Sequence, residues 1–156
     1  MEISWQDLPH PELEMQTLYS LLALRNAVFI VEQNCPYQDL DGRDLERDNR
    51  HILGWKEGAL IACARILAPE SAQQPVAIGR VVVAPDARGL NLGYRLMEQA
   101  LMSCAHHWPQ HDVWISAQAH LQSFYQKLGF RPQGDIYLED DIPHIAMLRA
   151  AETASL

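Results

Sequence analysis

A glycine-containing loop separates an apolar, strand-like segment from an amphipathic one in VVVAPDARGLNLGYRLMEQALMSC, residues 81–104. Glycine lets a backbone approach a ligand closely, and the first turn of a helix presents unpaired N–H groups at the positive end of its dipole. Such a loop can cradle a phosphate group, with an arginine as an added cation. The residues suited to this chemistry are Arg88, Gly89, Asn91 and Gly93.

Other phosphate-binding motifs do not fit this loop. It lacks the G-K-[ST] of a P-loop, and the spacing of Gly89 and Gly93 does not match G-x-G-x-x-G. A structural alternative stays open on this motif alone, because two glycines also serve a tight turn and close helix packing.

The elements around the loop are predicted from hydrophobic periodicity and turn residues. Apolar residues at intervals of three and four predict a helix from Leu13 to Gln33, followed by an acidic, turn-rich loop. The other predicted elements are strands His51–Trp55, Ala59–Leu67, Val76–Ala84 and 112–118, helices Leu92–His107 and 119–129, and two final strands joined at EDDIP. This order predicts a mixed α/β fold in which the strand–helix–strand unit forms a central parallel pair.

Length and composition narrow the class of protein. The chain has 156 residues, 48% of them apolar, which is typical of one globular domain over residues 1–156. No apolar run approaches the roughly 20 residues of a membrane span, and MEISWQDLPH has no signal-peptide pattern. A net charge of −8 disfavours nucleic-acid binding and is compatible with cationic substrates. Three cysteines without C-x-x-C spacing argue against a disulfide framework, so we expect a cytoplasmic protein.

Two segments contain metal-binding residue types without the matching spacing. In DLDGRDLERDNR, Gly42 is fourth from Asp39 rather than sixth, and Arg50 replaces the closing glutamate of a calcium loop. CAHHWPQH offers a cysteine and three histidines, but histidines also interact favourably with the expected helix end. We therefore expect no metal site.

The loop and a second segment, FYQKLGF, together resemble the GNAT superfamily of acyl-CoA-dependent N-acyltransferases. The family signature reads V-x-P-x-x-R-G-x-G-x-G, followed by F/Y-Y-x-x-x-G-F. The matching residues here are Val83, Pro85, Arg88, Gly89 and Gly93, then Phe124, Tyr125, Gly129 and Phe130. LRNAVFIVEQNCPYQDLDGRD, NRHILGW, AQAHLQSFYQKLGF and DIPHIAM are similar to the ElaA-like branch of small bacterial proteins. The resemblance covers nearly the whole chain and implies a mostly antiparallel sheet flanked by helices.

The same resemblance implies a site for acetyl-CoA. The strand at Val81 and Val83 would lie beside the pantetheine arm, and N–H groups from Arg88 to Tyr94 would hold the pyrophosphate. Asn91 replaces the usual middle glycine, and Gln118 replaces a frequent asparagine that contacts the coenzyme. The coenzyme-binding residues implied in this way are Val81, Val82, Val83, Arg88, Gly89, Leu90, Asn91, Leu92, Gly93, Tyr94, Gln118 and Tyr125.

Acyl transfer to an amine needs a neutral amine, a stabilised oxyanion and a proton for the departing thiolate. In the family, the amide at the position of Val83 stabilises the oxyanion, and Tyr125 matches the tyrosine near the sulfur. A tyrosine with a pKa of about 10 stays protonated at neutral pH and can protonate the thiolate. The alternative for Tyr125 is a core aromatic with a solvated hydroxyl.

The candidate general bases are Glu32 and His144. Glu32 follows the apolar run AVFIV and is expected to point inward, and the resemblance places its segment along the substrate cleft, while His144 is expected just before the final strand. Histidine titrates near neutrality without a shift, whereas a glutamate needs burial to raise its pKa. His120 or a water chain is a further route for the proton, and a packing role is the alternative for each residue. Arg25, Glu32 and Gln33 fit a buried structural network as well as a binding surface.

We therefore expect an N-acyltransferase that moves an acetyl group from acetyl-CoA to a primary amine of a small molecule or protein, by direct attack on the thioester. A catalytically silent acyl-CoA-binding or protein-interaction module is the alternative, since fold does not imply function. Acidic residues near the expected cleft favour a cationic acceptor: Glu32, Asp39 and Asp41. The sequence leaves the oligomeric state open, a homodimer included.

Overall fold

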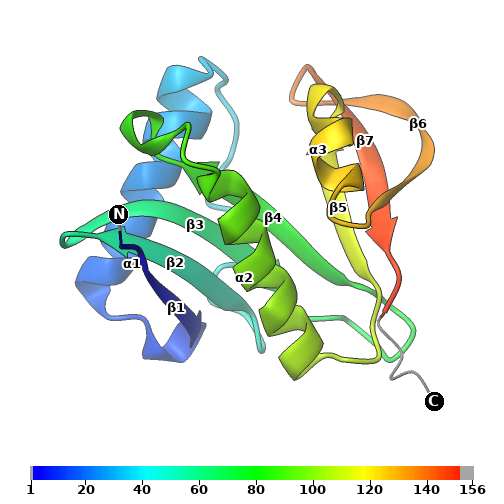
Figure 1. Ribbon diagram of the computed structural model, residues 1–156, viewed down its shortest axis with the longest axis horizontal. Coiled ribbons are helices and arrows are strands. Elements are labelled where there is room, and N and C mark those ends of the chain that lie inside the picture. Colours follow the sequence, from blue (N-terminus) through cyan, green and yellow to red (C-terminus); the bar gives the residue numbers. More distant parts are fainter. Residues whose placement is uncertain (1, 152–156) are drawn as a thin grey trace.

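The computed structural model describes residues 2–151 and contains one seven-stranded sheet with helices on both faces (Figure 1). The strand order is β1-β2-β3-β4-β5-β7-β6, and every neighbouring pair is antiparallel except β4 and β5. The strands are β1 (Ser4–Pro9), β2 (Arg50–Lys56), β3 (Ala59–Leu67), β4 (Val76–Val83), β5 (Val113–Gln118), β6 (Arg131–Glu139) and β7 (Ile142–Arg149). The helices are α1 (Met15–Arg25), α2 (Leu92–His107) and α3 (Gln122–Gln126), with short turns η1 (His10–Glu12), η2 (Asn26–Glu32), η3 (Pro85–Ala87) and η4 (Ala119–Leu121). The predicted mixed fold with a central parallel pair is confirmed.

The edge strand β1 is absent from the sequence-based prediction. It pairs antiparallel with β2 along its whole length, from Ser4 opposite Trp55 to Pro9 opposite Arg50. A Cβ atom on Gly54 would lie 2.7 Å from the Trp5 ring, so the glycine makes room for this aromatic side chain. Because six residues of weak alternation carry little signal alone, the strand is specified by its partner in the folded sheet.

The predicted helix from Leu13 to Gln33 is helical from Met15 to Glu32, but its second half is a π-helix rather than an α-helix. The α-helix ends at Arg25, and η2 continues it as a π-helical turn in which the Gln33 N–H donates to the Val28 carbonyl at 3.0 Å. The β-branched residues of NAVFIV disfavour a regular α-helix, because their side chains crowd the preceding turn. The predicted last helix is shortened in the same way: η4 and α3 are short, and Gly129 ends the segment with φ at +92°.

The two faces of the sheet have separate apolar cores. On one face, α2 and α3 cover residues that include Ile78, Ile115 and Met147. On the other face, where Figure 1 shows α1, residues of α1 pack over Leu53 and Val82. Within residues 2–151, no helix combines the length and the apolar character needed to cross a membrane.

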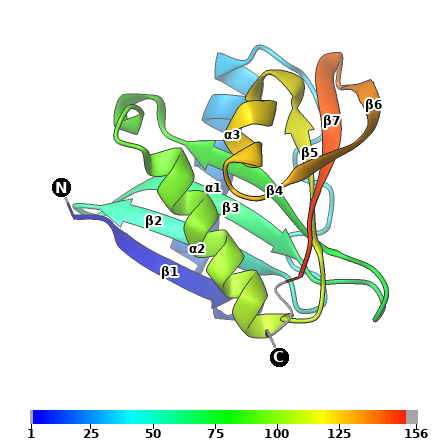
Figure 2. The same ribbon diagram turned by 45° about the vertical axis from the view of Figure 1, so that its right-hand side comes forward.

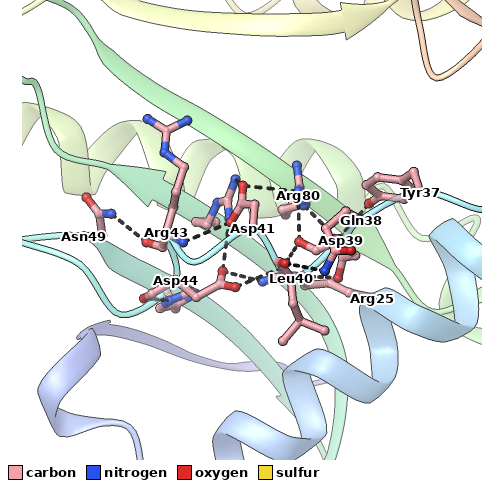
Figure 3. A network of polar contacts seen from close by, with 12 residues as sticks. Arg25, Tyr37, Gln38, Asp39, Leu40, Asp41, Arg43, Asp44, Asn49 and Arg80 are labelled. Atoms are coloured by element: carbon pink, nitrogen blue, oxygen red, sulfur yellow. Dashed lines mark hydrogen bonds and ion pairs between the residues drawn. The ribbon is translucent and has the colours of Figure 1, made fainter.

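A buried arginine anchors the loop between α1 and β2. Arg25 is 1% exposed, and its guanidinium donates to Asp39 at 3.0 Å and to Asp44 at 2.6 Å (Figure 3). Burial alone would lower the pKa of Arg25, but the bonds and charges of the two carboxylates raise it above its ordinary value. Burial would likewise raise the pKa of Asp44, yet hydrogen bonds and charges from Arg25 and Arg65 lower it.

Arginines from two strands complete this network. Arg65 on β3 donates to both carboxylate oxygens of Asp41, at 2.8 and 3.0 Å, and Arg80 on β4 donates to Asp39 at 2.8 Å. The Tyr37 hydroxyl also donates to Asp39, and the Arg80 guanidinium lies 5.5 Å from the centre of the Tyr37 ring. Three loop aspartates are therefore matched by three arginines, so the loop is held against α1, β3 and β4.

Replacing Arg25 with methionine should destabilise the protein by about 3–5 kcal/mol, because two buried carboxylates each lose one of their arginine partners. Arg50→Met is the control, since its bond to Asp7 lies nearer the surface and should contribute about 1 kcal/mol or less. Urea unfolding at pH 7 measures the free energy of unfolding of both variants. Because the folded pKa of Asp44 is lowered, its contribution is present above the unfolded value of about 3.9 and is lost as the pH falls through the folded pKa. Equal losses of stability in the two variants would contradict the structural role of the ion-pair network around Arg25.

Candidate active site

Strands β4 and β5 are paired at only two positions and then separate. The parallel ladder joins Val76 to Val113 and Ala77 to Trp114. Figure 2 shows the two strands diverging toward their carboxyl ends. The second half of β4 therefore has a strand partner, β3, on one side only within the described structure.

The backbone groups on the free edge of β4 belong to Val81 and Val83. The Ala84 N–H donates to the Ile61 carbonyl of β3 at 2.8 Å, and alternate residues of a strand face opposite neighbours. Val82 therefore also faces β3, while Val81 and Val83 face the gap beside β5. The expectation that Val82 lies at the coenzyme site is corrected, since its backbone faces β3 and its side chain is buried against the α1 side.

A β-bulge at Arg80 bends β4 just before this free edge. Between the register pairs Cys63–Val82 and Arg65–Gly79, β4 contains one residue more than β3. Arg80 has φ at +50°, a conformation that costs a non-glycine residue about 1–3 kcal/mol. The ion pairs of its side chain with the loop aspartates help to hold this conformation. An inserted residue bends and twists a strand, so the bulge accounts for the course of β4 away from β5.

The loop before α2 has the open backbone geometry that its sequence predicts. Gly89 has φ at +95°, and Asn91 adopts the left-handed conformation with φ at 59° directly before the first helical residue, Leu92. Asparagine tolerates this region better than most residues, so it can replace the glycine of the signature. Among residues 2–151, no side chain caps this end of α2, so the first helical N–H groups remain available for a ligand.

Gly93 lies where α2 approaches α3. A Cβ atom added there would lie 3.7 Å from Cζ of Phe124, which is an ordinary van der Waals distance. The backbone therefore accepts a small side chain at Gly93. Packing against Phe124 therefore does not by itself require glycine here.

Arg88 and Glu32 form a two-bond ion pair across the loop. Their bonds measure 2.6 and 2.8 Å, and Arg88 Nε also donates to the Val83 carbonyl at 3.2 Å. The expected inward position of Glu32 is wrong, because its side chain is 41% exposed. The hydrogen bond from Arg88 lowers the pKa of Glu32, whereas a base would need it raised. Arg25 belongs to the buried network, so the Arg25, Glu32 and Gln33 group does not form one unit.

Tyr125 lies on the same face of the sheet as α2. Its side chain is 8% exposed and meets the rings of Phe124 and Phe130 at centroid distances of 5.0 and 6.0 Å. Burial raises the pKa of Tyr125 to about 12, so the hydroxyl stays protonated well above neutral pH. No described residue hydrogen-bonds this hydroxyl, and its oxygen is not among the fully buried polar atoms without a partner. The ring is therefore fixed while the hydroxyl remains accessible.

His144 lies on the opposite face, within β7 rather than just before it as expected. It stands opposite Gln118 on β5 and Tyr137 on β6, and the Tyr137 ring stacks on its imidazole at 6.3 Å. Its Nδ1 lies 2.7 Å from the Ile142 carbonyl. A carbonyl only accepts, so Nδ1 carries the hydrogen and Nε2 of the neutral ring has the lone pair.

Three residues next to His144 were not singled out from the sequence. The Ser116 hydroxyl bonds the Tyr137 hydroxyl and donates to Glu139 Oε1 at 2.9 Å. Glu139 Oε2 lies 3.6 Å from His144 Nε2. Alternation along VWISAQ could have placed Ser116 beside Gln118, but only strand pairing brings β6 to them.

Asp39 and Asp41 do not supply the free negative charge expected for a cationic acceptor. Asp39 is buried and bonded to Arg25 and Arg80. Burial would raise the pKa of Asp41, but Arg65 and its other partners lower it to about 2. These carboxylates are already neutralised by arginines, so any recognition of a cation must come from other residues.

Comparison with known proteins agrees with this geometry. A family model described as "Acetyltransferase (GNAT) domain" matches residues 17–150. Protein ElaA of Escherichia coli K12 is 58% identical over 147 residues, which cover 94% of this chain and 96% of that protein. The crystal structure of E. coli ElaA superposes with a TM-score of 0.91 at 56% identity, covering 95% of this chain and 99% of that one.

Two further structures place the fold more broadly. A Pseudomonas aeruginosa protein titled an acyl-CoA N-acyltransferase has a TM-score of 0.91 at 48% identity, covering 96% of this chain and all of that one. An aminoglycoside 6'-N-acetyltransferase complexed with coenzyme A shares the fold alone, with a TM-score of 0.73 at 13% identity and complete coverage of both chains. With a family match over most of its length, the chain belongs to the GNAT acetyltransferase family, in its ElaA-like branch.

Proposed function

We propose that this protein transfers an acetyl group from acetyl-CoA to a primary amine by direct attack of the amine on the thioester. The observation that carries the proposal is the free edge of β4 beside an uncapped helix end and an accessible tyrosine hydroxyl. Family membership supports acyl transfer, and the Pseudomonas relative is titled an acyl-CoA N-acyltransferase.

Coenzyme A fits the residues on the α2 face. In a related fold, an aminoglycoside 6'-N-acetyltransferase has been crystallised with coenzyme A. Here the N–H groups of Gly89 to Tyr94 would bind the pyrophosphate at the positive end of α2. Val81 and Val83 would bond the amide groups of the pantetheine arm as a neighbouring strand does. Gln118 lies at the end of β5 beside the same gap, but alternation along the strand turns its side chain to the opposite face, where it pairs with His144.

Three groups of the chain then serve the reaction. The Val83 N–H faces the gap and would donate to the oxyanion formed when the amine attacks. Tyr125 would protonate the departing thiolate, since its hydroxyl has no partner among the described residues and keeps its proton at neutral pH. His144 Nε2 would take a proton from the amine on the other face of the sheet. Since β4 and β5 are no longer paired beyond Ala77 and Trp114, we propose that acyl donor and acceptor approach the region between these strands from opposite faces of the sheet.

Replacing Gly93 with valine should lower acetyl-CoA affinity about tenfold or more, equivalent to about 1.4 kcal/mol, because the added side chain occupies ligand space between α2 and α3. Met102→Val is the matched control, since it places the same β-branched residue at an exposed position of the same helix. Isothermal titration calorimetry on the folded variants measures the effect. An unchanged affinity in Gly93→Val would show that the loop before α2 does not bind the phosphates of acetyl-CoA.

Replacing Tyr125 with phenylalanine keeps the ring but removes the acid, so kcat should fall by roughly 10²–10⁴-fold. Acetyl-CoA affinity should change little, because the lost interaction acts mainly in the transition state. Tyr19→Phe, at an exposed position of α1, is the control. Thiol release with a panel of amine and peptide acceptors provides the measurement. A silent acyl-CoA-binding module predicts no turnover even in the wild type, and an unchanged kcat in Tyr125→Phe would make the tyrosine structural.

A paired substitution separates the two candidate bases. His144→Gln should lower kcat by roughly 10²–10⁴-fold, because the lone pair at Nε2 is lost. Glu32→Gln should have a much smaller effect, since this carboxylate is exposed and engaged with Arg88. The same thiol-release assay, run with saturating acetyl-CoA, compares the two. A large loss in Glu32→Gln with full activity in His144→Gln would reverse the assignment.

A further inference from the structure

The pairing of β5, β7 and β6 gathers polar side chains on the sheet face opposite Tyr125. Side chains alternate along strands, and Ile115, Ala117, Ile145 and Met147 point into the core beneath α2 and α3. The residues between them therefore point to the other face. They include Ser116 on β5 and His144 on β7, with Tyr137 and Glu139 reaching them from β6.

Within this group, two hydrogen-bond acceptors face each other. Neutral His144 has its hydrogen on Nδ1, so Nε2 can only accept, and the Glu139 carboxylate also only accepts. The two atoms lie 3.6 Å apart, and no hydrogen bond joins them. His144 is 7% exposed, and its Nε2 has no hydrogen-bond donor among residues 2–151. A donor placed between the two acceptor atoms would satisfy both of them. This donor can be a proton on the imidazole ring or an N–H group of a ligand.

Glu139 is held in place and can be reached by a ligand. Ser116 donates to its Oε1 at 2.9 Å, which leaves the lone pairs of Oε2 free, and the side chain is 47% exposed. None of the arginines or lysines in residues 2–151 forms an ion pair with Glu139. This distinguishes it from Asp39, Asp41 and Asp44 of the loop, each of which is matched by an arginine.

The polar side chains around Glu139 and His144 lie where an acyl acceptor could bind. Ser116 lies on β5, the strand that borders the gap beside β4. On the far side, Cys35 Sγ contacts the carbonyl of Asp140 at 3.5 Å, so the end of η2 meets the turn between β6 and β7. The polar side chains around Glu139 and His144 therefore lie between the separated ends of β4 and β5 and the segment that follows α1.

We propose that Glu139 and His144 form a binding site for a protonated primary amine, so that the acceptor is a cationic alkylamine. The proposal rests on the proposed function, and it names the substrate class and the residues that recognise it. The ammonium donates to Glu139 Oε2 and passes one proton to His144 Nε2. The resulting imidazolium is then stabilised by the Glu139 carboxylate.

The remaining steps balance as an acetyl transfer. The nitrogen lone pair forms the N–C bond to the acetyl carbon, and the C–S bond breaks when the tetrahedral intermediate collapses. Tyr125 gives its proton to the thiolate. A second proton lost by the nitrogen restores Tyr125 through solvent, and the His144 proton is released to solvent.

The test measures binding without acetyl transfer. n-Butylammonium chloride is titrated into the protein while the His144 imidazole signals are followed by NMR, with n-butanol as the uncharged probe. Glu139→Gln removes the carboxylate charge and keeps the shape. Asp141→Asn is the matched control, since it makes the same change of charge at an exposed position of the adjacent turn.

A saturable shift of the His144 signals is expected with n-butylammonium but not with n-butanol. The affinity should fall about tenfold or more in Glu139→Gln, as expected for loss of a charge-assisted bond, and stay unchanged in Asp141→Asn. No shift in the wild type, an equal affinity in Glu139→Gln, or an equal response to n-butanol would each overturn the proposal. Binding of the cation by a protein that shows no acetyl transfer would instead support this site and refute the proposed function.

Discussion

The Asp39 carboxylate links the parts of the molecule on which the site depends. One oxygen accepts from Arg25 at the end of α1, and the other accepts from Arg80 in the bulge of β4 and from Tyr37. The bulge bends β4, and the bend separates it from β5 after two paired positions. A loop carboxylate thereby helps to fix the opening where the reaction is proposed to occur. Removing any one partner would leave charge buried, so the arrangement is held cooperatively.

The sheet places the proposed acyl-donor site and the proposed acceptor site on opposite faces. The helix end at Leu92 and the Tyr125 hydroxyl lie on the side of α2 and α3, which suits a polyanionic acyl donor and the thiolate that leaves it. The side chains of Glu139 and His144 lie on the other side, which suits a cation. Keeping these charges apart avoids competition between the phosphates and the carboxylate for the same ammonium group. The bond between Arg88 and the Val83 carbonyl connects the phosphate loop to the gap itself.

Local patterns in the sequence predicted the glycine-containing loop before α2 and the parallel pair, because each depends on residues close along the chain. The left-handed conformation of Asn91 agrees with the same reasoning. Features that depend on distant partners were missed: the pairing of β1 with β2, and the contact of Glu139 with Ser116. Glu32 was misplaced for a related reason, since the π-helical turn and Arg88 determine its direction.

NMR of backbone amides during titration with acetyl-CoA shows whether the coenzyme lies along the free edge of β4. The amides of Val81 and Val83 face the gap, so their signals should shift and exchange more slowly with solvent when the ligand binds. The Val82 amide already faces β3 and should change much less, which provides an internal control. Saturable binding that leaves Val81 and Val83 unchanged would contradict the account.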